Sequence, residues 1–255
     1  MRPLIGFDPD KDYLLDPQQR RPAGWCPECG REIWSDGQDK CNICAAMGLE
    51  TEPDWGHLRF FDKGHIYMVG DQRVPSVSDL CRFLQAEVYG KDVQTWKLEA
   101  AALKGTAVHK ATEDLDKTGR AEIDEDFAPY LTAYAAFLRD HEVRWEKIEE
   151  PGYNDELGYA GTIDRYGSVD GSPTLLDIKT TYKVERVLCH ASLNLYRMML
   201  ERKGVQVERM LILHLNRDGT YKLVPFESDD TVPMALITLH RHTAKKRRTR
   251  RKTNE

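Results

Sequence analysis

The sequence contains no long hydrophobic run. Although 40% of its 255 residues are hydrophobic, no apolar stretch approaches the roughly 18 residues that a membrane-spanning helix needs. The start of the chain lacks the apolar core of a signal peptide, and there is no internal repeat. These absences predict a cytosolic protein that does not contact a membrane. The length of 255 residues is enough for one substantial domain and a small appendage.

Cysteine is also scarce, and the six cysteines are unevenly placed. Cys81 and Cys189 each stand alone among apolar residues and are expected to be small buried side chains. A cytosolic setting disfavours disulfides. The other four form two Cys-x-x-Cys pairs separated by eleven residues, at Cys26, Cys29, Cys41 and Cys44.

This spacing predicts a tetrahedral structural Zn²⁺ site within residues 25–50. So short a segment buries little core, and the metal would therefore supply its folding energy. An iron–sulfur cluster, which also takes four thiolates, is the alternative. The predicted module either only stabilises the N-terminal region or also contacts DNA or a partner protein.

The charge is distributed unevenly along the chain. The formal net charge is −5, yet residues 239–255 carry eight Lys or Arg and a single acid, Glu255. This composition predicts a disordered basic tail, which would attract a polyanion through counterion release. Residues 1–24 are rich in Pro, Asp, Gln and Arg and are predicted to be a flexible arm.

Residues 58–238 alternate between helical and strand patterns and are predicted to form one α/β domain. A hairpin is expected near 58–72, and a helix is expected to begin at a cap on Ser76 or Ser78. The remaining expected helices are 93–103, 106–117, 127–141, 187–202 and 231–243, and the remaining strands are 143–149, 159–165, 174–179, 207–215 and 221–226. This order predicts a mixed central β-sheet flanked by helices.

Two short segments carry the strongest chemical signal. Gly161–Asp164 and Leu175–Thr180 are apolar runs that each contain an acid, Asp164 and Asp177. On adjacent strands the two carboxylates meet at one sheet edge, and Lys179 shares a strand face with Asp177. Two carboxylates and an ammonium predict a site that holds a hard divalent cation and activates water against a phosphodiester.

The order of these motifs extends the signal. Gly105-Thr106-x-x-His109 comes first on a helix, then Gly-Thr-Ile-Asp164, then Asp177-Ile-Lys179, then a helix with Tyr196. Over residues 58–226 this set resembles the PD-(D/E)XK nuclease superfamily, in the RecB-like and Cas4-like branch that includes phage exonucleases. The resemblance implies a restriction-endonuclease-like core. It also implies that His109, Asp164, Asp177 and the backbone carbonyl of Ile178 bind Mg²⁺ or Mn²⁺.

By the same resemblance, Lys179 and Tyr196 act with Asp164 and Asp177 in catalysis. The family's helical glutamine is replaced by Ser192, and the Pro-Asp of the superfamily's name is absent as written. The expected function is a metal-dependent DNA nuclease, an exonuclease acting on single- or double-stranded DNA with free ends. The resemblance implies phage or mobile-element recombination, with a partner protein, in a bacterial or phage-infected cytoplasm. The alternative is an inactive nuclease fold that binds nucleic acid or protein through the zinc module and the basic tail.

Overall fold

The computed structural model describes residues 24–25, 32–33, 58–61, 65–90 and 95–252. The four cysteines of the predicted zinc module lie outside these residues, as does the predicted N-terminal arm. Of this part only two short strands are described, β1 (Gly24–Trp25) and β2 (Glu32–Ile33), which pair antiparallel. The zinc module therefore remains a prediction.

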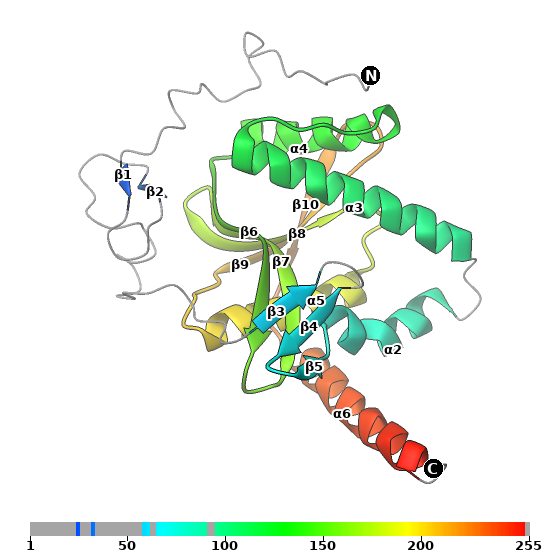
Figure 1. Cartoon of the computed structure of the whole chain (residues 1–255). Helices are drawn as coiled ribbons and strands as arrows, with labels where there is room; N and C mark the ends of the chain where they lie inside the picture. The colour runs from blue at the N-terminus through cyan, green and yellow to red at the C-terminus, as the bar shows by residue number, and fades with distance from the viewer. Residues whose placement is uncertain (1–23, 26–31, 34–57, 62–64, 91–94, 253–255) are drawn as a thin grey trace.

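The centre of the domain is a five-stranded mixed sheet (Figure 1). Its strands lie in the order β10-β9-β8-β7-β6, and only β8 and β9 are parallel. The bounds are β6 (Val143–Asn154), β7 (Tyr159–Val169), β8 (Ser172–Lys179), β9 (Arg209–Leu215) and β10 (Tyr221–Phe226). Helix α5 (Arg186–Arg202) connects the two parallel strands, as a parallel connection requires a crossover.

Helices cover both faces of this sheet (Figure 1). One core holds residues of α3 (Thr95–Thr118) and α4 (Ala128–Asp140), which follows a short 3₁₀ turn at Glu125–Phe127. The other holds residues of α2 (Val77–Tyr89), α5 and α6 (Thr231–Lys252). Along β8, Leu175 belongs to the α5 core, whereas Leu176 and Ile178 belong to the α3 core. Asp177 and Lys179 therefore face the α5 side.

A second, three-stranded sheet precedes α2. It consists of β3 (Leu58–Phe61), β4 (Ile66–Val69) and β5 (Gln72–Val74), in that order. The predicted hairpin is thus extended by a third strand. Ser76 caps α2 as expected: its hydroxyl accepts from the N–H of Asp79, and the Asp79 carboxylate accepts from the N–H of Ser76.

Two helices differ from the sequence-based expectation. Helix α3 runs through Gly105 without a break, so the two helices expected on either side of this glycine are one. A single glycine costs a helix only about 1 kcal/mol relative to alanine, which packing of α3 on the sheet offsets. Helix α6 extends to Lys252 and includes most of the basic segment 239–255, for which disorder was expected. No helix in the described part of the chain has the length and apolar character to cross a membrane.

Candidate metal and catalytic site

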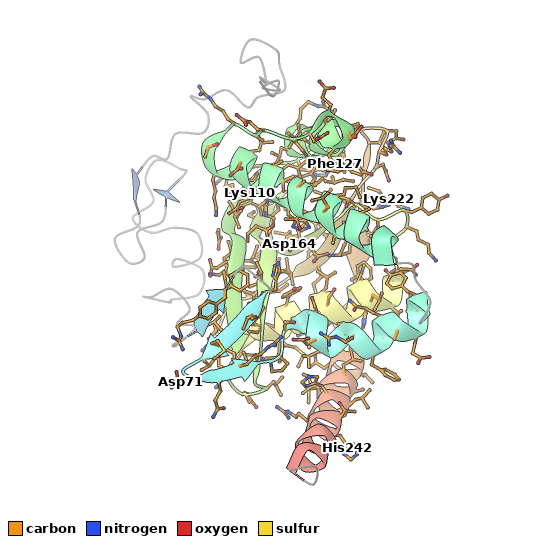
Figure 2. All side chains as sticks on the ribbon, turned by 45° about the vertical axis from the view of Figure 1, so that its right-hand side comes forward. Asp71, Lys110, Phe127, Asp164, Lys222 and His242 are labelled. Atoms are coloured by element: carbon orange, nitrogen blue, oxygen red, sulfur yellow. The ribbon has the colours of Figure 1, made fainter. Side chains whose placement is uncertain are left out.

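The site lies where two central strands separate. β7 and β8 are paired from Val169–Ser172 to Arg165–Leu176, and the pairing ends there, while β8 continues beside β9 as far as Lys179. Asp164 and Asp177 are the first residues beyond the last pair. The Asp164 Oδ2 accepts a hydrogen bond of 2.9 Å from the Ile178 N–H, which bridges the opening. We call this opening the fork; Figure 2 labels Asp164 near the centre of the molecule, below α3.

Three side chains converge on one side of the fork. His109 from α3, Glu149 from β6 and Asp164 from β7 each offer a ligand atom, and these atoms lie within 4.8 Å of one another. The His109 Nδ1 is 2.9 Å from Glu149 Oε1 and 3.6 Å from Asp164 Oδ2. An imidazole and two carboxylates at this spacing form a candidate site for a divalent cation.

Glu149 is the member of this group that the sequence analysis missed. The β6–β7 ladder pairs Ile148 with Arg165 and Glu150 with Ile163, so Glu149 lies opposite Asp164 between two pairs. Its φ of 49° places it in the left-handed region, which is uncommon for a residue with a side chain. Strained backbone of this kind is concentrated at functional sites. The local conformation thus brings the Glu149 carboxylate into the fork.

The buried guanidinium of Arg165 holds the Glu149 carboxylate in place. Arg165 is fully buried, and its Nη1 donates to Glu149 Oε1 at 3.0 Å and to the Asp164 carbonyl at 2.7 Å. Its Nε donates to Asp116 Oδ2 at 2.8 Å, and its Nη2 donates to Thr112 Oγ1 at 3.1 Å. Arg165 thereby ties β7 and β6 to α3, the helix that carries His109. A charge buried in this way is tolerable because every side of it is paired.

The other side of the fork carries Asp177 and Lys179. Asp177 is buried, and its Oδ2 lies 2.5 Å from Lys179 Nζ. This ion pair offsets much of the cost of burying the Asp177 charge. Because a carboxylate oxygen has more than one lone pair, Asp177 can accept a further ligand beside Lys179.

Tyr196 reaches the site from α5. Burial raises the pKa of its hydroxyl well above the usual value, and the charges of Asp164 and Asp177 add to the rise. Gly161 gives the ring its room, because a Cβ on Gly161 would lie 2.7 Å from Tyr196 Cε1. The glycine of the Gly-Thr-Ile-Asp segment is thus explained by the close approach of α5 to β7. Thr162, the next residue, is hydrogen-bonded through Oγ1 to the Tyr67 hydroxyl at 2.7 Å.

Each side of the fork places a cationic side chain beside carboxylates. Burial alone would lower the pKa of His109, but Asp164 and Glu149 outweigh it and raise the pKa to about 9. Burial raises the pKa of Asp177 to about 6 against the opposing effect of Lys179, and Asp164 adds to the rise. Burial opposes the charge of Lys179, yet Asp177 and Asp164 raise its pKa. Without a metal, the His109 imidazolium and the Lys179 ammonium thus neutralise the carboxylates.

The donor set fits a Mg²⁺ or Mn²⁺ ion. Three carboxylates, Glu149, Asp164 and Asp177, surround the fork with one imidazole, and oxygen ligands are those that these cations prefer. Asp177 does not belong to the group whose ligand atoms lie within 4.8 Å, although the charges of Asp164 and His109 shift its pKa.

The structure places the remaining predicted residues as follows. Ile178 presents its N–H to Asp164, on the edge of β8 that faces the fork. Ser192, which stands at the family's glutamine position, donates its hydroxyl to the Cys189 carbonyl of its own helix at 3.2 Å. It is thus partnered within α5. Cys81 and Cys189 are buried free thiols, as expected.

Comparison with known proteins gives distant structural neighbours only. No family model matches the sequence, and no curated protein matches it. The solved structure of a protein named SSO0001 is similar over 70% of this chain and 78% of its own, at 16% identity and a TM-score of 0.39. An alkaline exonuclease from Laribacter hongkongensis is similar over 70% of this chain and 92% of its own, at 14% identity and a TM-score of 0.38. The structure of the same exonuclease in complex with dAMP is similar over 71% of this chain and 93% of its own, at 14% identity and a TM-score of 0.36. Likeness at this level carries no argument about the reaction.

Proposed function

We propose that the chain is a metal-dependent nuclease that hydrolyses phosphodiester bonds of DNA at the fork. The observation that carries this proposal is the convergence of His109, Glu149 and Asp164 beside the buried Asp177–Lys179 pair, where β7 and β8 separate. Carboxylates, an imidazole and an ammonium at one point of a sheet are groups suited to metal-assisted phosphodiester hydrolysis.

Some residues of the site would bind the cation, and others would contact the substrate. His109, Glu149, Asp164 and Asp177 would hold Mg²⁺ or Mn²⁺, and the Ile178 carbonyl is the backbone ligand that we propose beside them. When bound, the cation would supply Lewis-acid chemistry, neutralising phosphate charge and acidifying water. Arg165 holds Glu149 in place from the buried side.

Lys179 is assigned an electrostatic role. Its side chain is about one-third exposed, so its ammonium is open to a phosphate that binds at the fork. Because Asp177 and Asp164 raise its pKa, it stays protonated at neutral pH. A protonated amine stabilises the negative charge that develops on the phosphoryl oxygens, and it is a poor base for removing a proton from water. We assign Tyr196, whose hydroxyl also stays protonated, the role of donating a hydrogen bond to the same group.

The finer assignment is an exonuclease that acts at DNA ends in phage or mobile-element recombination. The resemblance of the ordered motifs supports this assignment. Linear and circular DNA of the same sequence, single- and double-stranded, should be incubated with the full chain and Mg²⁺ or Mn²⁺. Degradation of the linear forms alone is expected; equal cutting of the circles would contradict end dependence.

Asp177→Asn is the decisive variant for the nuclease assignment, and Asp155→Asn, a surface acid on the β6–β7 loop that pairs with Arg202, is the matched control. We expect Asp177→Asn to abolish cleavage and the control to cut as well as the wild type. Cleavage by Asp177→Asn, or intact DNA with the wild type under both metals, would overturn the proposal. Binding of DNA without turnover would instead support the inactive binding fold, which the self-partnered Ser192 favours.

A further inference from the structure

The segment that follows Lys179 presents aromatic rings beside the fork. Tyr182 is fully exposed, and Tyr89, at the end of α2, is about half exposed. Large apolar rings are normally at least partly buried, because exposure forfeits their hydrophobic stabilisation. Tyr182 comes three positions after the proposed electrostatic residue Lys179 in the chain. We call Tyr89 and Tyr182 the aromatic rim.

The backbone that carries Tyr182 is fixed on both sides. The Thr180 carbonyl accepts from Lys104 Nζ of α3 at 2.7 Å, and the Thr181 carbonyl is 2.6 Å from His214 Nε2 of β9. The Thr181 hydroxyl donates to the Lys183 carbonyl at 2.8 Å. These bonds hold the loop while its tyrosine makes no packing contact, so the ring is presented in a defined place.

Tyr89 lies on the same side of the fork. Burial is the largest cause of its raised pKa, and the charges of Glu185, Cys189, Lys179 and Lys183 also act on it. Tyr89 is the last residue of α2, and Tyr182 lies in the loop that leads into α5. Helices α2 and α5 pack together here (Figure 1), so the two tyrosines flank one rim.

The charges of the rim suit a polyanion. Lys183 and Arg186 follow Tyr182 in the chain and are exposed, and Lys179 is partly exposed. Lys183 pairs with Glu185 at 2.8 Å, and the Arg186 guanidinium lies over the Phe226 ring. Exposed aromatic rings next to cations are the arrangement that binds single-stranded nucleic acid, because an unpaired base stacks on the ring while its phosphate meets the cation. Base pairs inside a duplex do not offer a free face for such stacking.

We infer that the aromatic rim binds unpaired nucleotides of the DNA strand whose phosphodiester lies at the fork. Tyr182 stacks on one base, and Tyr89 contacts the neighbouring nucleotide. This inference rests on the proposed function, because the strand is the substrate of that site. It adds the substrate class: the chain engages single-stranded DNA or a frayed end in preference to intact duplex.

Binding of fluorescent oligonucleotides, measured by anisotropy, tests the rim. The full chain with Asp177→Asn serves as background, so that cleavage of the oligonucleotide does not disturb the binding measurement. Tyr182→Ala should weaken binding of a single-stranded oligonucleotide about 5- to 150-fold, the range for stacking one base. Tyr182→Trp should restore it, and the Met234→Ala variant, which removes an exposed apolar side chain on α6, should bind like the background. Blunt duplex should be unaffected by Tyr182→Ala.

Two results would overturn the inference: unchanged single-strand affinity in Tyr182→Ala, or an equal loss on blunt duplex. The unfolding temperature of Tyr182→Ala should equal that of the background, because the Tyr182 side chain has no packing to lose.

A cleavage assay on the wild type distinguishes failure of the rim from failure of the nuclease assignment. If the wild type cuts single strands and Tyr182→Ala cuts them equally at low substrate concentration, the rim fails and the nuclease stands. If no cleavage occurs but Tyr182 governs binding, the nuclease fails and the rim stands as a binding site.

Discussion

The two sides of the fork hold their charges in opposite ways. On the β6–β7 side, the Arg165 guanidinium is fully buried and its bonds reach four different groups. On the β8 side, the charges are held by one ion pair between the buried Asp177 and the partly exposed Lys179. The guanidinium is thus enclosed by several partners, whereas the ammonium pairs with one acid and is partly open to solvent.

This difference suggests a division of labour. A preorganised side holds a ligand in place at little cost when the ligand binds. A side with a buried carboxylate and a partly exposed ammonium is suited to charge that appears only with metal and substrate. Substitutions on the first side should therefore change stability and metal affinity, and substitutions on the second should change cleavage.

The largest effect is expected from removing the buried guanidinium. Arg165→Met removes the buried cation that pairs with both Asp116 and Glu149, and breaking a buried ion pair costs about 3–5 kcal/mol. Urea unfolding should show a loss of this size. Arg144→Met, which removes a more exposed arginine of β6 paired with Glu142, should change stability by less than about 1 kcal/mol. Equal losses in the two variants would refute the central role of Arg165.

The next effect separates cleavage from metal binding. Lys179→Met should lower kcat about 10²- to 10³-fold, the cost of one preorganised donor to a developing charge. Its Mn²⁺ affinity, measured by calorimetric titration, should not fall, because the variant removes a cation next to the ligands. A fall in affinity comparable with the fall in kcat would place Lys179 in metal binding instead.

A smaller effect is expected for the ligand that the structure adds. Glu149→Gln keeps the shape of the side chain but removes its charge, and we expect about 10- to 100-fold weaker Mn²⁺ binding, as for loss of supporting groups at metal sites. Glu150→Gln, the adjacent acid that pairs with Lys147 at 2.5 Å, is the matched control and should bind normally. Identical behaviour of the two would remove Glu149 from the site.

The smallest effect concerns pH. The raised pKa of His109, about 9 in the folded chain, means that its protonation stabilises the fold fully below about pH 6.5, the unfolded value. This stabilisation is lost as the pH rises through about 9. Without added Mg²⁺ or Mn²⁺, the wild type should lose about 1 kcal/mol more stability than His109→Gln between pH 6.5 and 10. Parallel curves for the two proteins would contradict the charge on His109.

The sequence was most informative where periodicity and motif order acted together. Alternation and turns predicted the five strands and the helices that flank them, and the two Asp-ending segments predicted that Asp164 and Asp177 lie opposite each other. Glu149 could not be predicted in this way. It follows Glu146 and precedes Glu150 on one strand, and only its positive φ and the register opposite Asp164 distinguish it.

Arg165 was hidden for a related reason. Arginine is usually exposed, and its position after Asp164 says nothing about Asp116 and Thr112, which lie some fifty residues earlier. Helix ends were also missed, because packing decides them: α3 continues through Gly105, and α6 continues into the basic segment. The four-cysteine module stays a prediction, which zinc analysis of the purified chain would test.

The most direct test of the central claim is the rate of phosphodiester cleavage of linear DNA as a function of Mn²⁺ concentration, in the wild type and in Glu149→Gln. We predict no cleavage without added metal, a saturable rise in the wild type, and a half-saturation point about 10- to 100-fold higher in the variant. Cleavage that does not depend on the metal, or the same half-saturation in both proteins, would contradict a cation site formed by His109, Glu149 and Asp164.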